Sequence, residues 1–187
     1  MSLNSLEKAR ANGKYVVMDT NTPYFELVKA VFPNAKILTD RFHIVQQITR
    51  ALNQLRIKTM NNFQKTEPTK YQRLKRFWKL LLKHASDLNS SNCRYDRSFR
   101  RPMTQKAIID EILSYNEQLA RAYETCQLLP YHFKHKDIHN FFDTINSLDQ
   151  RLPQCLFKKL NFLNKYKLGI HCALITGDSN DALEGTR

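Results

Sequence analysis

The sequence predicts a predominantly helical α/β chain with two parallel strands near its N-terminus. Two short apolar runs, 15–18 and 35–38, are each followed closely by an aspartate, and they flank an amphipathic segment over 23–32. This order is typical of a strand–helix–strand unit. Beyond residue 40 apolar residues recur at helical spacing, and only four glycines occur in 187 residues. We therefore expect one helix after another through the long middle of the chain.

The two strands place an acid at the same edge of the expected sheet. The first strand is expected over 15–18 and the second over 36–39, with Asp19 after the first and Asp40 after the second. In a parallel α/β unit, ligand and metal chemistry collects at the carboxyl ends of the strands. Two strands are too few for a stable sheet, so the sequence indicates part of a larger α/β domain with a mainly helical insertion.

Helices account for most of the remaining expected structure. Pro130 is expected to end one of them, and the Ser-, Asn- and Arg-rich residues 87–102 are expected to form a loop. The expected helices cover residues 2–11, 23–32, 40–63, 69–84, 104–128, 136–148 and 155–175. The face of helix 40–63 that carries Arg50 and Arg56 is expected to be exposed.

The charge balance favours a polyanionic partner. Lys and Arg number 30 against 17 Asp and Glu, which gives a net charge of +13. Cations that neutralise phosphates release condensed counterions, so nucleic acid is favoured over the alternative of a merely basic protein. None of the four cysteines forms a C-x-x-C pair, and no apolar run approaches the ~20 residues of a membrane span. We expect a cytoplasmic protein with no membrane partner.

Taken one at a time, the acids have two interpretations each. Asp19 and Asp40 could cap the helices that follow them or serve as metal ligands. His43 lies in the first turn after Asp40, where a structural hydrogen bond is the more common role. Glu184 alone would be interpreted as a solvated acid.

Two further groups of residues leave alternatives open. His135 and His139 lie one helical turn apart near His132 and could share a metal, but no cysteine or third ligand type lies nearby, which disfavours that interpretation. The basic and aromatic residues of 70–83 fit a nucleic-acid contact and a solvated helix face equally well.

Two segments resemble a known family. The stretch VVMDTNTPYFELVKAVFPNAKILTDRFHIVQQITRALNQLRI is similar to the catalytic region of bacterial insertion-sequence transposases that share an FPNA…DRFH signature. These enzymes belong to the Asp-Asp-Glu (DDE) group with an RNase H-like core. The tail, SNDALEGT, resembles the family's SN-x-x-LEG-x-N segment.

The resemblance implies roles for particular residues. Asp19 corresponds to the second catalytic aspartate and Glu184 to the catalytic glutamate, and Asp40 and His43 match an Asp-x-x-His element. Asp19 and Glu184 would hold Mg²⁺ or Mn²⁺ in a two-metal site for DNA cleavage and joining.

The resemblance also implies an organisation and partners. Residues 1–63 would form a partial RNase H-like core, 64–175 a helical insertion and 176–187 the start of the catalytic C-terminal helix. The expected partners are the DNA of insertion-sequence terminal repeats and a second copy or a full-length transposase. The residues expected to contact DNA are Arg41, Arg50, Arg56, Arg73, Arg76 and Trp78.

Departures from the family pattern lead to a further expectation. No strand before Tyr15 supplies the first catalytic aspartate, and Arg187 stands where the pattern has Asn. The sequence therefore predicts an internal or truncated piece of a transposase that is inactive alone. The alternative is a non-catalytic helical DNA-binding or dimerisation module that regulates a full-length transposase.

Overall fold

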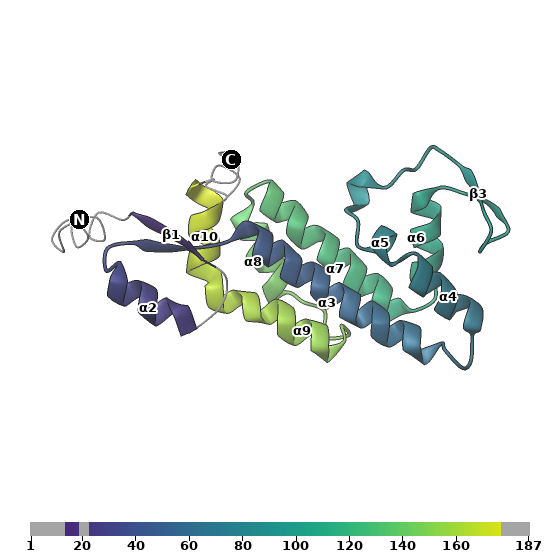
Figure 1. Cartoon of the computed structure of the whole chain (residues 1–187), viewed down its shortest axis with the longest axis horizontal. Coiled ribbons are helices and arrows are strands. Elements are labelled where there is room, and N and C mark those ends of the chain that lie inside the picture. The colour runs from purple at the N-terminus through teal and green to yellow at the C-terminus, as the bar shows by residue number, and fades with distance from the viewer. Residues whose placement is uncertain (1–13, 19–22, 177–187) are drawn as a thin grey trace, which may run out of the picture.

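The predicted strand–helix–strand unit is present at the N-terminal end. A computed structural model describes residues 14–18 and 23–176 (Figure 1). Strand β1 (Tyr15–Met18) pairs in parallel with β2 (Lys36–Thr39), and helix α2 (Pro23–Val31) connects them. Val, Ile and Tyr favour extended backbone in the strands, and Pro33-Asn34 separates α2 from β2. The predicted strand boundaries and parallel pairing are confirmed.

Helix α3 (Arg41–Asn62) is the central element of the molecule. It begins directly after β2, because the Asp40 carboxylate accepts a hydrogen bond from the Phe42 backbone N–H at 3.0 Å and caps the helix. Its 22 residues span about 33 Å at 1.5 Å per residue. The helix therefore leads from the strands to the far end of the molecule.

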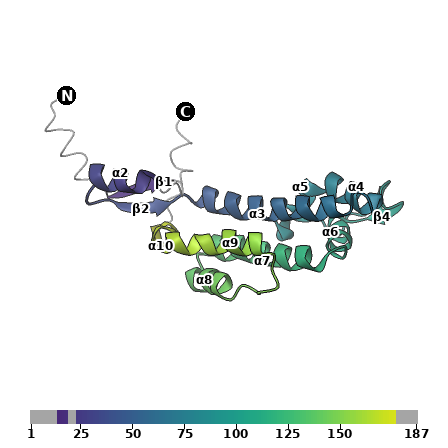
Figure 2. The same cartoon turned by 90° about the horizontal axis from the view of Figure 1, so that it is seen from below.

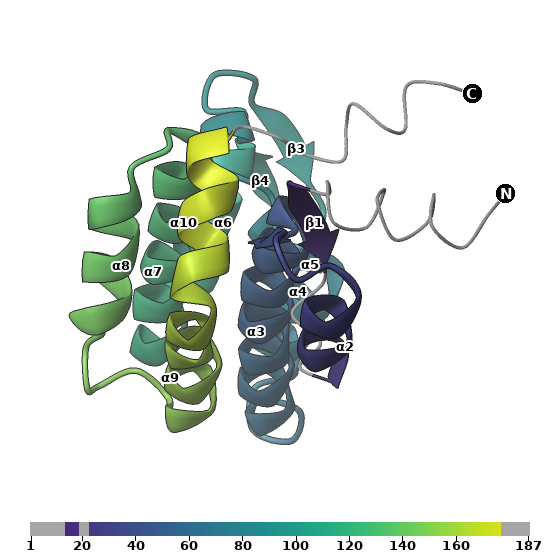
Figure 3. The same cartoon turned by 90° about the vertical axis from the view of Figure 1, so that its left-hand side faces the viewer.

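The other long helices cover one side of α3. Figure 2 shows α7 (Glu117–Lys134), α9 (Gln154–Asn161) and α10 (Lys167–Thr176) in a second layer. Helix α8 (Ile138–Asn146) packs on the side of this layer that faces away from α3, and Figure 3 shows the same order end-on. One apolar core joins the two layers. Its largest fully buried side chains include Ile44, Ile48, Leu74, Leu81, Ile109, Leu119, Leu129, Phe133, Phe141 and Ile145. Burial of this apolar stripe is the main force that holds the helices together.

Three expected helices are each divided, two of them in the middle of the chain. The segment expected as 69–84 forms α4 (Pro68–Arg76) and α5 (Trp78–Leu81), and a 3₁₀ turn η1 (Ala85–Asp87) follows it. The segment expected as 104–128 forms α6 (Gln105–Leu113) and α7. Asn116 causes the second division, because its side chain accepts a hydrogen bond from Leu119 N–H at 2.8 Å and starts a new helix.

The expectation that Pro130 ends a helix is wrong. Pro130 lies inside α7, which continues to Lys134. Proline removes one backbone donor, but Leu129 and Phe133 on either side of it are buried in the core. We infer that this packing outweighs the lost hydrogen bond. The chain turns after α7 at Lys136, whose φ is 57°.

The remaining differences lie in irregular segments. Residues 87–102 were expected as a loop but contain β3 (Arg94–Asp96), which pairs antiparallel with β4 (Arg101–Met103). The segment expected as 155–175 is divided into α9, a 3₁₀ segment η2 (Phe162–Tyr166) and α10. The expected helix 2–11 lies outside the described residues. Among the described residues, no helix is both long enough and apolar enough to span a membrane.

Candidate functional site

The carboxyl ends of the two strands form the first candidate site, which we call the strand edge. Met18 pairs with Thr39, and the Asp40 backbone N–H donates to the Met18 carbonyl at 3.0 Å. Asp19 follows Met18 directly but lies outside the described residues, as does Glu184. The structure thus describes residues on both sides of Asp19, and for Glu184 only the chain up to Thr176.

Asp40 and His43 both lie where the sequence predicts. Asp40 is half-buried at the strand edge and caps α3, so its interpretation as a helix cap is confirmed. His43 lies one turn into α3, and the Gln47 side-chain amide donates to its Nε2 at 2.8 Å. Because α3 begins directly after β2, its N-terminus lies at the strand edge, where Asp40 already compensates the Phe42 N–H.

Helix α10 returns the chain to the strand edge. A Cβ atom added at Gly169 would lie 2.4 Å from Thr39 Oγ1 and 3.4 Å from Thr39 N, so only glycine permits this approach. Thr39 is buried, and its hydroxyl has no hydrogen-bond partner. Residues 39 and 169 are 130 positions apart in the sequence. The helices between these two residues therefore begin and end beside β2, at the strand edge.

The three histidines near Pro130 have separate partners. His139 contacts Asp143 at 2.8 Å, His132 lies 3.8 Å from Asp137, and His135 Nδ1 hydrogen bonds to the Tyr131 carbonyl at 2.8 Å. Within the described residues, no three His, Cys, Asp or Glu side chains are grouped as metal ligands.

Four of the six residues expected to contact DNA lie at the surface. Arg41 and Arg50 are exposed on α3, the Arg76 side chain is 55% exposed, and Trp78 is 40% exposed. These side chains are available to a polyanion. Together they form a surface of exposed cationic and aromatic side chains on α3, α4 and α5, which we call the basic surface.

Arg56 is buried, so the expectation of an exposed position is wrong for it. Its guanidinium donates to the Leu74 carbonyl at 2.9 Å and to Asn53 Oδ1 at 2.8 Å. The Leu74 carbonyl lies near the C-terminus of α4, where the last carbonyls lack helical partners and a cation is favourable. Burial lowers the pKa of Arg56. The Arg56 side chain therefore joins α3 to the C-terminal end of α4.

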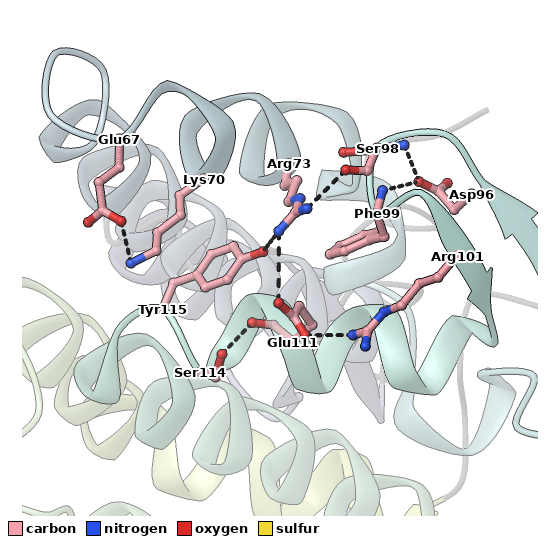
Figure 4. Close-up of polar contacts among 10 residues, drawn as sticks. All are labelled: Glu67, Lys70, Arg73, Asp96, Ser98, Phe99, Arg101, Glu111, Ser114 and Tyr115. Carbon is pink, nitrogen blue, oxygen red and sulfur yellow. Dashed lines mark hydrogen bonds and ion pairs between the residues drawn. The ribbon is translucent and has the colours of Figure 1, made fainter.

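Arg73 also uses its guanidinium inside the protein (Figure 4). It donates to Tyr115 Oη at 2.8 Å and to the Ser98 carbonyl at 2.9 Å, and it lies 4.1 Å from the centre of the Phe99 ring. Glu111 Oε1 is 3.8 Å away. Arg73 thereby fixes the β3–β4 hairpin onto α4 and α6.

Burial accounts for the pKa shifts of two other titratable groups. Burial raises the pKa of the Cys126 thiol to about 12, so this cysteine stays protonated in the core. Burial also raises the pKa of Tyr115, and the hydrogen bond from Arg73 acts in the opposite direction. Neither group has the features of a reactive site.

Sequence reasoning missed the arginines of the β3–β4 hairpin. Arg94, Arg97, Arg100 and Arg101 are all exposed. The signal was present as four arginines within eight residues of a segment expected only to be a loop. They extend the basic surface to the far end of the molecule.

Comparison with known families gives one match. A family model described as "Transposase", for the ISL3 group of DDE transposases, matches residues 2–187. Comparisons with curated proteins and with solved structures found no match.

Proposed function

Because the chain belongs to this transposase family, we propose that it supplies metal-binding acids and DNA-contacting surface for DNA cleavage and strand transfer. Asp19 and Glu184 would hold Mg²⁺ or Mn²⁺, and Asp40 and His43 would lie beside them at the strand edge. The DNA substrate would be the terminal repeats of an insertion sequence.

The observation that carries this proposal is the return of α10 to the strand edge. From Gly169 to Thr176 the helix advances only about 10 Å. Seven residues then lie between Thr176 and Glu184, and an extended chain could cover these eight Cα–Cα steps over up to about 27 Å. Met18, the residue before Asp19 in the sequence, ends the paired strand β1 at this edge. Nothing in this geometry prevents the two acids from meeting, although 165 residues separate them.

The donors at the strand edge suit a hard divalent ion. The half-buried Asp40 carboxylate offers oxygen there, and Mg²⁺ prefers oxygen ligands. When bound, the metal would activate the attacking oxygen and stabilise the leaving oxygen of an in-line displacement at phosphorus. The chain's own contribution would be to hold the metal with Asp19 and Glu184 and to direct the N-terminus of α3 toward the DNA phosphate.

The proposal assigns different parts of the chain to a catalytic core and to an insertion. Residues 1–63 and 176–187 would belong to an RNase H-like core, and 64–175 would be the helical insertion. This sequence offers two acids in contexts that match the family pattern, Asp19 and Glu184. Since two carboxylates hold a metal pair poorly, we propose that the 187 residues alone do not cleave DNA.

A metal-binding experiment tests the proposal. We expect weak Mn²⁺ binding that Asp19→Asn and Glu184→Gln each reduce roughly tenfold or more, since loss of even an outer-shell partner has an effect of this size. Titration followed by electron paramagnetic resonance measures free and bound Mn²⁺ directly. Asp87→Asn, at an exposed acid in η1, is the control and should have no effect. Equal affinity in all four proteins would contradict the proposed site.

A DNA assay addresses the inactivity of the chain alone. With Mg²⁺ or Mn²⁺ and terminal-repeat DNA, we expect no nicking by the purified protein. Nicking that Asp19→Ala abolishes would show that the 187 residues are catalytically sufficient.

The basic surface favours a second candidate function. The chain would act as a non-catalytic DNA-binding or dimerisation module that regulates a full-length transposase. That function predicts salt-dependent DNA binding that Asp19→Ala and Glu184→Ala leave unchanged, together with no Mn²⁺ binding that depends on either acid.

A further inference from the structure

The β3–β4 hairpin, residues 94–103, is an isolated basic element, which we call the basic hairpin. It lies at the end of the molecule opposite to β1 and β2 (Figure 1). Arg94, Arg97, Arg100 and Arg101 are exposed, and Tyr95 is 66% exposed. An element of ten residues thus presents four guanidinium groups and one aromatic ring.

The basic hairpin has a fixed base. Phe99 is buried, and its ring centre lies 5.7 Å from that of Phe77. Asp96 Oδ1 accepts hydrogen bonds from the backbone N–H groups of Ser98 at 2.7 Å and Phe99 at 3.3 Å. Arg73 holds the Ser98 carbonyl from the other side (Figure 4). The exposed arginines are therefore carried on an ordered turn, so less conformational entropy is lost when they bind a ligand.

Most of this positive charge is not neutralised within the described structure. Arg101 pairs with Glu111 at 2.9 Å, but Arg94, Arg97 and Arg100 have no acidic partner among the described residues. The Asp96 side chain is mostly buried and serves the turn. Arg100 has φ of 54°, a conformation that glycine or asparagine adopts more readily. Arginine at that position suggests that its charge has a use.

Neighbouring helices extend the surface. Two shallow grooves meet at Gln105 and Ile108, and each contributes cations. The first is lined by Asn89, Asn92, Arg94, Tyr95, Asp96 and Met103, and the second by Arg76, Phe77, Lys79, Leu80 and Lys83. The basic hairpin and α5 therefore belong to one continuous basic surface.

We propose that the basic hairpin binds the phosphate backbone of duplex DNA at a distance from the strand edge. This inference rests on the proposed function. Helix α3, whose 22 residues span about 33 Å, leads away from the strand edge, and the basic hairpin lies at the opposite end of the molecule (Figure 1). A duplex long enough to extend past the strand edge could therefore also contact the basic hairpin. Arginine suits this task because its planar group binds phosphate oxygens in pairs.

The salt dependence of DNA binding provides the first test. The variant Arg94→Gln, Arg97→Gln, Arg100→Gln is compared with a charge-matched control, Lys134→Gln, Lys158→Gln, Lys165→Gln, whose residues are exposed in the layer of α7 to α10. Fluorescence anisotropy with a random-sequence duplex gives the slope of log K against log salt. We expect the slope to fall by about three in the hairpin variant, about one for each phosphate that the protein no longer neutralises, and by less than one in the control. Equal changes in both variants, or no change in the hairpin variant, would overturn the proposal.

Cross-linking tests the position without removing any arginine. Cys93 directly precedes β3 and is exposed, and Cys155 on α9 is also exposed. A photoactivated cross-linker is attached to Cys93 in a Cys155→Ser chain, and to Cys155 in a Cys93→Ser chain. We expect cross-links to duplex DNA from Cys93 and few from Cys155. Equal yields, or a higher yield from Cys155, would overturn the proposal.

The two experiments also separate this inference from the proposed function. If the unmodified protein does not bind duplex DNA, the proposed function fails and the inference fails with it. If the protein binds DNA but either the hairpin variant or the Cys93 label does not give the expected result, only the inference fails.

Discussion

Replacing Gly169 by valine should lower the free energy of unfolding by about 3 kcal/mol, at the upper end of the usual cost of overpacking. A Cβ atom at this position would lie 2.4 Å from Thr39 Oγ1, and the Thr39 N and Ile37 O atoms leave little room behind it. Helix α10 would have to move away from β2, which would also displace the segment that leads to Glu184. Urea unfolding followed by circular dichroism measures the effect.

Two companion variants identify the cause of this destabilisation. His171→Val places the same side chain at an exposed position of α10, where it should change stability by less than about 0.5 kcal/mol. Thr39→Ala removes the nearest atom, so Gly169→Val should cost about 1 kcal/mol less in that background. An equal destabilisation by His171→Val, or no coupling with Thr39→Ala, would show that α10 does not approach β2 in this way.

Replacing Arg73 by methionine should cost about 3 kcal/mol, because the variant lacks two hydrogen bonds from a charged group and the stacking on an aromatic ring. The side chain is only 17% exposed, so little water could replace these interactions. The Ser98 carbonyl would lose its donor, and the basic hairpin would lose its attachment to α4. Hydrogen exchange of the amides of residues 94–103 should therefore accelerate more than exchange in α7.

Arg76 provides the matched control for Arg73. It lies in the same helix, but it is 55% exposed and its nearest acid, Asp96, is 3.7 Å away. Arg76→Met should cost less than about 1 kcal/mol, the usual limit for an exposed pair. Similar destabilisation by both variants, or unchanged exchange in the hairpin of Arg73→Met, would contradict the anchoring role.

Local patterns were sufficient to predict the N-terminal unit. Apolar runs ended by acids gave both strands at their observed boundaries, and the position of Asp40 gave the start of α3. The divisions of the later helices were missed because apolar residues continue at helical spacing through Phe77 and Tyr115. The capping side chain of Asn116 interrupts the backbone without interrupting that spacing.

Features that depend on distant contacts could not be predicted from local patterns. Arg56 lies on the polar side of α3 by spacing alone, and it is buried only because α4 folds back over it. Strands β3 and β4 have three residues each, too few to show an alternating pattern. The approach of Gly169 to Thr39 joins positions 130 residues apart. The roles expected for Asp19 and Glu184 came from the resemblance to insertion-sequence transposases, because the spacing of residues in the sequence does not assign them.

The most direct measurement of the shared metal site is cleavage of the protein backbone by bound iron. Fe²⁺ takes the place of Mg²⁺ at oxygen ligands, and with ascorbate and peroxide it produces radicals that cut the chain close to the ion. Mass spectrometry then locates the cuts. We expect them in three segments, near Asp19, near Asp40 and near Glu184, and we expect Asp19→Asn to suppress all three together. Cuts confined to one of these segments, or cuts that persist unchanged in Asp19→Asn, would show that the two acids do not share a metal ion.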